Sequence, residues 1–147
     1  MILLFSQCFC LVLFDRILHG KVKDVSRWYL LHIVTNILIT FYTYDAFVLL
    51  YKNPYRLIND QFFIIDEAFI VFFIHIYHCI AYNCTKDDII HHLTFSIIGP
   101  FIGCIIPVGY CGKLIIFFIC GFPGIFDYIT AVLREERFIS RQTKLKC

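Results

Sequence analysis

The chain has 147 residues, of which 60% are hydrophobic and 16% charged, and its mean hydropathy is +0.77. A soluble domain of this length cannot bury so much apolar surface, because much of a small protein's volume lies near its surface. The net charge of +2 gives no reason to expect a nucleic-acid partner. We therefore expect an all-α, polytopic integral membrane helix bundle.

Apolar segments in chain order predict about five transmembrane helices in a single domain that covers residues 1–147. A spanning helix needs about 20 mostly apolar residues. The first segment is shorter, but it lacks the basic start and the small-residue cleavage site of a signal peptide, so an uncleaved span is favoured. The predicted spans are residues 2–18, 28–51, 62–82, 89–108 and 114–133, followed by a basic tail, 134–147.

Polar residues in the second segment recur at helical spacing. His32, Asn36, Thr40 and Thr43 fall on one face of a helix. Since polar side chains that face lipid are costly, this face is expected to point into the bundle. Two interpretations remain open: a packing face joined by hydrogen bonds to other helices, or the lining of a cavity.

The third segment carries Glu67, His75 and His78. Glu67 and His78 are expected on one helical face, with His75 next to it. For each histidine, a satisfied packing role and a functional role are both open.

The fourth segment begins with "KDDIIHH". Asp87 and His91 are four residues apart, as are Asp88 and His92, so each carboxylate can reach one imidazole along a helix. A carboxylate beside an imidazole fixes its tautomer and raises its basicity, as a general base requires. The alternative is structural, because aspartates at a helix start cap unpaired amide groups.

The fifth segment contains "CGFPGIFDYI". Pro123 lies between two glycines and predicts a bend in the helix. Asp127 follows within about one turn and is either a site residue or the partner of Arg134 on the same face.

Eight cysteines are present, mostly in apolar segments, and we expect free thiols rather than a disulfide framework. No Cys-x-x-Cys pair is present to indicate zinc, so no metal site is expected. The six histidines are too few for a di-iron centre of the membrane hydroxylase type.

Basic residues are distributed unequally between the two sides of the predicted topology. One side receives only Lys52, Arg56 and Lys113. Because cytosolic segments carry an excess of Lys and Arg, the carboxy terminus is expected in the cytosol and the amino terminus in the lumen or outside. The cytosolic side receives Arg16, Lys21, Lys23, Arg27, Lys86, Arg134, Arg137, Arg141, Lys144 and Lys146.

Two stretches, "RWYLLHIVTN" (residues 27–36) and "DDIIHH" (residues 87–92), resemble the TLC domain family. This family includes the ceramide synthases, translocation-associated membrane proteins and lipid-regulating relatives. The resemblance covers about residues 27–133 and implies that His91 and His92 form the functional pair, with His32 and Asp127 in the same cavity. The family domain usually has more spans, so a short or partial member is expected. The chain also lacks the later His-Asp of the ceramide synthases.

The resulting hypothesis is a TLC-like protein that binds, senses or modifies a membrane lipid, in the endoplasmic reticulum or another endomembrane. If it is an enzyme, the resemblance implies N-acyl transfer, with acyl-CoA as co-substrate and no tightly bound cofactor. One alternative is a non-enzymatic scaffold or lipid sensor, and another is a bis-histidine haem protein; a homo-oligomer is also open. The predicted catalytic residues are His91, His92, Asp87 and Asp88, and the predicted substrate-binding residues are His32, Asn36, His75, His78 and Asp127.

Overall fold

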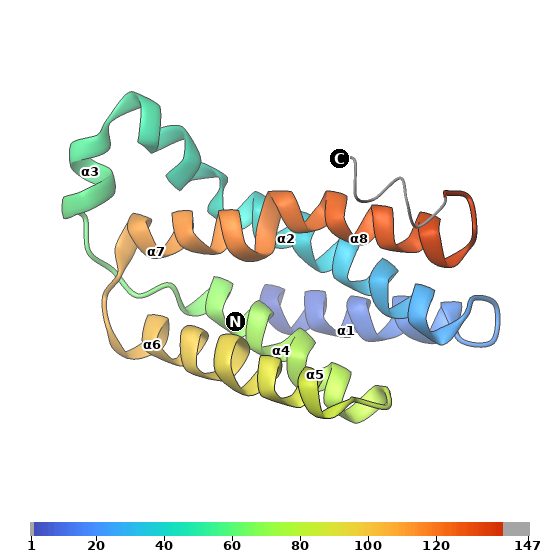
Figure 1. Cartoon of the computed structure of the whole chain (residues 1–147). Coiled ribbons are helices and arrows are strands. Elements are labelled where there is room, and N and C mark those ends of the chain that lie inside the picture. The colour runs from blue at the N-terminus through green and yellow to red at the C-terminus, as the bar shows by residue number, and fades with distance from the viewer. Residues whose placement is uncertain (1, 140–147) are drawn as a thin grey trace.

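A computed structural model describes residues 2–139, apart from the side chains of residues 2, 95–97 and 100, and this part of the chain contains helices and no strand (Figure 1). The elements in chain order are α1 (Ile2–Leu18), α2 (Asp24–Lys52), α3 (Pro54–Asn59), α4 (Ile65–Ala81), α5 (Lys86–His91), the π-helix η1 (His92–Ile98), α6 (Gly99–Ile105), α7 (Gly109–Ile116), the π-helix η2 (Phe117–Gly121) and α8 (Phe122–Glu135).

The all-helical prediction is confirmed for the described residues, and α1 has the predicted bounds. The number of spans is confirmed only in part. Two helical stretches, Asp24–Lys52 and Gly109–Glu135, are long and apolar enough to cross a membrane. In contrast, α1 and α4 have 17 residues each, and the fourth predicted span is divided among α5, η1 and α6. Five spans are therefore not shown.

The long helix α2 is the centre of the molecule, because it packs against α1, α3, α4, α7, η2 and α8 (Figure 1). Two apolar clusters join it to α1 and α4: one contains Leu11, Leu31 and Ile74, and the other contains Ile39 and Ile70. On the side of α8, a Cβ atom at Gly124 would lie 2.5 Å from Asn36 Nδ2. Glycine at this position therefore lets α8 approach α2 closely.

The polar face predicted for the second segment points into the bundle. His32, Asn36 and Thr43 are buried on α2. The hydroxyl groups of Thr40 and Thr43 donate to carbonyl oxygens one turn earlier, so they need no partner on another helix. Asn36 meets α8, and His32 faces a pocket. Most of this face is therefore packed, but its two threonines bond within α2 and not to another helix as the packing interpretation expected. Only the His32 end of the face lines a pocket.

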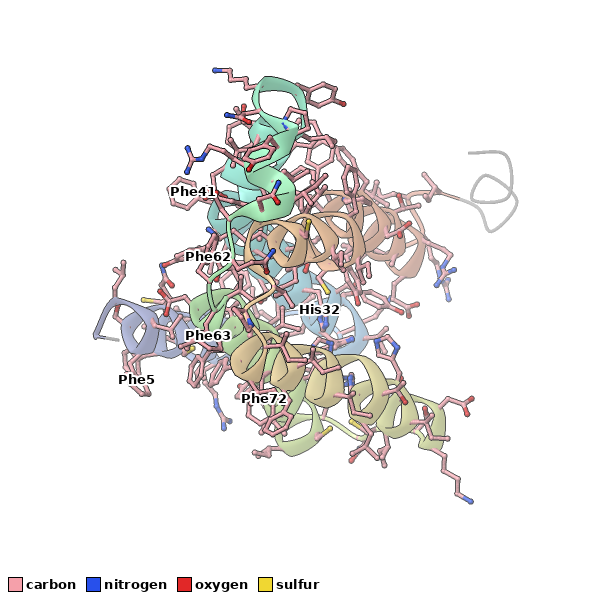
Figure 2. All side chains as sticks on the ribbon, turned by 90° about the vertical axis from the view of Figure 1, so that its left-hand side faces the viewer. Phe5, His32, Phe41, Phe62, Phe63 and Phe72 are labelled. Carbon is pink, nitrogen blue, oxygen red and sulfur yellow. The ribbon has the colours of Figure 1, made fainter. Side chains whose placement is uncertain are left out.

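Apolar side chains cover much of the outside of the bundle. Figure 2 shows Phe5, Phe41, Phe63 and Phe72 around the edge, whereas His32 lies between the helices, and each of these phenylalanines is exposed. Charged and polar side chains are instead found among the buried residues. A surface of this kind is compatible with a lipid environment, where the outside is apolar and polar groups find partners inside.

Candidate functional site

A pocket of about 640 Å³ opens at the end of the bundle where α2 begins, α4 ends and α5 begins. Polar and aromatic side chains converge there from α2, α4, α5, η1, α8 and the loop after α4. The lining residues are Asp24, Val25, Trp28, Tyr29, His32, His75, His78, Ala81, Tyr82, Asn83, Thr85, Asp88, His91, His92 and Tyr128.

Five of the six histidines of the chain line this pocket, and only His19 does not. His32 comes from α2, His75 and His78 come from α4, and the adjacent pair comes from the junction of α5 and η1. The ring centroids lie 4.7 Å apart for His78 and His92, 4.9 Å for His75 and His92, 6.0 Å for His32 and His75, and 6.1 Å for His75 and His91. The predicted histidines are therefore brought together.

The indole of Trp28 forms one wall of the pocket. It stacks on His78 with ring centroids 3.4 Å apart and meets His32 edge-on at 3.5 Å. Tyr128 of α8 also contacts His32, with ring centroids 4.5 Å apart. Because these aromatic rings pack closely on His32 and His78, the two imidazoles have little freedom to turn.

Two imidazoles have their tautomer set by backbone carbonyl groups. His75 Nδ1 lies 2.6 Å from Val71 O, and His32 Nδ1 lies 3.2 Å from Trp28 O, both one turn earlier in the same helix. A carbonyl oxygen only accepts, so Nδ1 carries the proton in each ring. The Nε2 lone pairs of His32 and His75 are thereby left for another partner.

His92 and His78 form a direct pair. His92 Nε2 and His78 Nδ1 are 2.7 Å apart, so one ring donates to the other. His92 is buried, and its second nitrogen, Nδ1, has no hydrogen-bond partner in the part of the chain that the structure describes. The chain changes from an α-helix to a π-helix at this residue, and short π-helical turns are frequent at functional sites.

The two aspartates of the "KDDIIHH" motif lie in the first turn of α5. Asp88 accepts from the backbone amide of Thr85 at 2.8 Å and from its hydroxyl at 2.7 Å, while Thr85 Oγ1 accepts from the Asp88 amide. This capping box uses the carboxylate that was predicted to orient His92, and its hydrogen bonds lower the pKa of Asp88. Asp87 is exposed and does not line the pocket. The capping interpretation is therefore correct for Asp88.

Asp127 and Asn36 also lie outside the pocket. Asp127 is exposed, and the next residue, Tyr128, takes the inward position instead. The reason is the register of α8: the π-helical turn η2 precedes it, and Gly121 departs from helical geometry at φ −80° and ψ −111°. Asn36 is buried against Gly124 one turn beyond His32.

A buried ion pair below the pocket was missed at the level of sequence. The carboxylate of Asp15 accepts from Arg27 Nη1 at 3.3 Å and from the Tyr77 hydroxyl at 2.6 Å, and the Tyr82 hydroxyl also donates to it. Arg27 further stacks over the Tyr82 ring, 4.6 Å from its centroid. Asp15 was detectable, because it is the only acidic residue in the first apolar segment.

The remaining polar residues of the spans pair at a different place, near the start of α4. Lys113 Nζ lies 3.0 Å from Glu67 and 3.1 Å from Asp45. Glu67 is therefore neutralised by Lys113 and does not join His78, although the two share a helical face as predicted. Asp45, which had no sequence interpretation, is the second partner of the same lysine.

Comparison of the chain with protein families, with curated proteins and with solved structures finds no match.

Proposed function

We propose that this chain is a TLC-like integral membrane protein that binds a membrane lipid with the polar end of the lipid in the histidine pocket. The observation that carries the proposal is the convergence of five histidines in one pocket at the end of an apolar-surfaced bundle. The Nε2 lone pairs of His32 and His75 can accept hydrogen bonds from lipid hydroxyl or amine groups. The acyl chains of the lipid would pack against the apolar outer surface of the bundle. An endomembrane such as the endoplasmic reticulum is the proposed location.

A second candidate function is N-acyl transfer at the same place, and the pairing of His78 with His92 favours it. When His92 Nε2 donates to His78 Nδ1, the Nδ1 lone pair of His92, a residue of the pocket lining, is left to act as a base. It would take a proton from a lipid amine as the amine nitrogen attacks the thioester carbonyl of acyl-CoA, and the thiol of CoA would leave. His78 then has the orienting role that the sequence suggested for Asp88.

The lipid proposal is tested by the lipids that copurify with the chain. We expect one lipid class to be enriched with the wild type and lost from the double variant His91→Ala/His92→Ala, as measured by untargeted lipidomics of detergent-purified protein. His19→Ala is the matched control, because His19 is exposed and lies outside the pocket. Identical lipid profiles for all three proteins would contradict the proposal. Incubation with labelled acyl-CoA and lipid extract then separates binding from transfer.

A further inference from the structure

We infer that the histidine pocket also binds a divalent transition-metal ion of the zinc class, with His75, His91 and His92 as its ligands. One ligand nitrogen from each of these residues lies within 4.8 Å of the others. A tetrahedral ion with Zn–N bonds of about 2.0 Å needs nitrogen separations of about 3.4 Å. Side-chain movements on the order of 1 Å would bring the three ligand nitrogens to the distances that a bound ion requires.

The unpartnered nitrogen of His92 is an independent observation that points to a ligand. His92 is only 6% exposed, and its Nδ1 has no hydrogen-bond partner among the described residues, although buried polar atoms are nearly always satisfied. A metal ion would use this lone pair and remove the cost of leaving it unpaired.

Two further contacts have the form of outer-shell support for metal ligands. Ligating histidines usually donate their other ring N–H to a carbonyl, a carboxylate or water, which orients the ring. His75 does so through Nδ1 to Val71 O at 2.6 Å, which directs its Nε2 lone pair elsewhere. His92 Nε2 can donate to His78 Nδ1 at 2.7 Å, which leaves Nδ1 of His92 for the ion.

The chemistry of the ligands selects the class of metal. Imidazole nitrogens suit Zn²⁺ and other late first-row ions, whereas Mg²⁺ and Ca²⁺ prefer oxygen ligands. Three histidines leave one position of a tetrahedral ion open, as in catalytic zinc sites. That position would face the pocket, where the carboxylates of Asp24 and Asp88 add negative charge to the lining.

A competing ligand set is His78, Cys84 and His92, whose ligand atoms also lie within 4.8 Å of one another. It would require both rings of the 2.7 Å His78–His92 pair to bind the same ion, so their hydrogen bond would be lost. The three-histidine set keeps the pair intact.

Metal binding does not depend on the proposed lipid binding, but it affects the proposed role of His92 in acyl transfer. An ion on Nδ1 of His92 occupies the lone pair that a general base would use. The metal and the base role of His92 therefore exclude each other. If the proposed lipid does bind, its oxygen atoms could fill the open position on the ion.

The test is a titration of the detergent-purified full chain, stripped with a chelator, with Co²⁺ alone and no added lipid. We expect the visible absorption of tetrahedral cobalt, saturating at a single ion per chain and displaced by Zn²⁺. If the chain gives no specific cobalt spectrum, the inference is overturned, even if the chain still binds lipid. Conversely, cobalt binding by a chain that enriches no lipid would leave this inference and remove the lipid proposal. A Soret band in the purified protein would indicate haem and also overturn it.

Variants then assign the ligands. His75→Ala and His92→Ala should each weaken cobalt binding by more than about 100-fold, and His78→Ala by about 10–100-fold as an outer-shell residue. His19→Ala and Cys84→Ser should bind cobalt like the wild type. A cobalt spectrum with sulfur-to-metal charge transfer that disappears in Cys84→Ser would overturn the three-histidine assignment in favour of the competing set. If an alanine variant does not accumulate, the cobalt titrations of the wild type and of Cys84→Ser still decide whether the chain binds a metal ion and whether Cys84 is a ligand.

Discussion

Arg27 shows how much a single residue depends on one buried partner. Its guanidinium contacts two carboxylates at 3.3 Å: that of Asp15, whose side chain is 1% exposed, and that of Asp24, which is 76% exposed. The Arg27 Nε atom has no hydrogen-bond partner, so the arginine is already incompletely satisfied. An exposed pair contributes little because water screens it, whereas a buried charge left alone is costly.

We therefore predict that Asp15→Asn lowers the free energy of unfolding by about 3–5 kcal/mol, because the only carboxylate left to the buried Arg27 is that of Asp24, which is exposed and screened by water. Asp24→Asn is the matched control, since it removes the exposed partner of the same arginine, and it should cost less than about 1 kcal/mol. Unfolding of both variants in detergent, followed by helical circular dichroism, measures the difference. Equal effects would show that the buried position of Asp15 is not what stabilises the pair.

At the scale of elements, the start of α7 depends on a glycine. Gly109 has φ +54°, and its amide donates to Phe62 O at 2.9 Å. A Cβ atom there would lie 2.0 Å from the backbone oxygen of Asp60, which cannot move like the end of a side chain. This contact joins the loop before α4 to the last helical unit, α7–η2–α8. Gly20 also has a positive φ, +76°, but a Cβ atom there would meet nothing within 4 Å.

The pair of glycines separates steric contact from backbone strain. Gly20→Ala should cost only the strain of a positive φ, about 1 kcal/mol of unfolding free energy. Gly109→Ala should cost clearly more, because strain is added to the clash with Asp60, and it should reduce the yield of folded protein. Thermal melts and size-exclusion profiles in detergent provide the measurement. A Gly109→Ala variant as stable as Gly20→Ala would mean that the loop before α4 moves away without cost.

For the whole molecule, the open question is its orientation in a membrane. Asn59, at the end of α3, and Asn83, just after α4, lie at opposite ends of α4, whose 17 residues rise about 25 Å. Both asparagines are exposed. The structure also places Lys113 within α7, where it pairs with Glu67 and Asp45, and not in a loop.

We predict that a flexible loop carrying a glycosylation sequon, inserted after Asn59, gains a glycosidase-sensitive mass shift, and that the same loop after Asn83 gains none. The reason is the excess of basic residues on the side of Asn83, which indicates the cytosol. The native "NCT" sequon at Asn83 should stay unmodified for the same reason. The reverse pattern would place the histidine pocket in the lumen, away from cytosolic acyl-CoA, and would count against acyl transfer.

Composition and spacing determined the helical class and the inward face of α2, because both depend on residues close together in the chain. Burial of Asn36 and Thr43 follows from a spacing of three to four residues and needs no knowledge of other helices. The local sequence around Asp88 likewise indicated a helix cap, but it could not separate that interpretation from a catalytic role.

Only the tertiary structure decided which polar groups meet. His78 and His92 are 14 residues apart, Arg27 reaches Asp15 on another helix, and Glu67 takes Lys113 from a distant segment. Periodicity gives the polar face of each helix, but it does not give the rotation and depth of that helix against its neighbours. The sequence therefore indicated that the five histidines belong together, but it did not predict that ligand atoms of His75, His91 and His92 lie within 4.8 Å of one another. Tyr128 rather than Asp127 lines the pocket for the same reason, since the rotation of α8 against α2 cannot be derived from its local pattern.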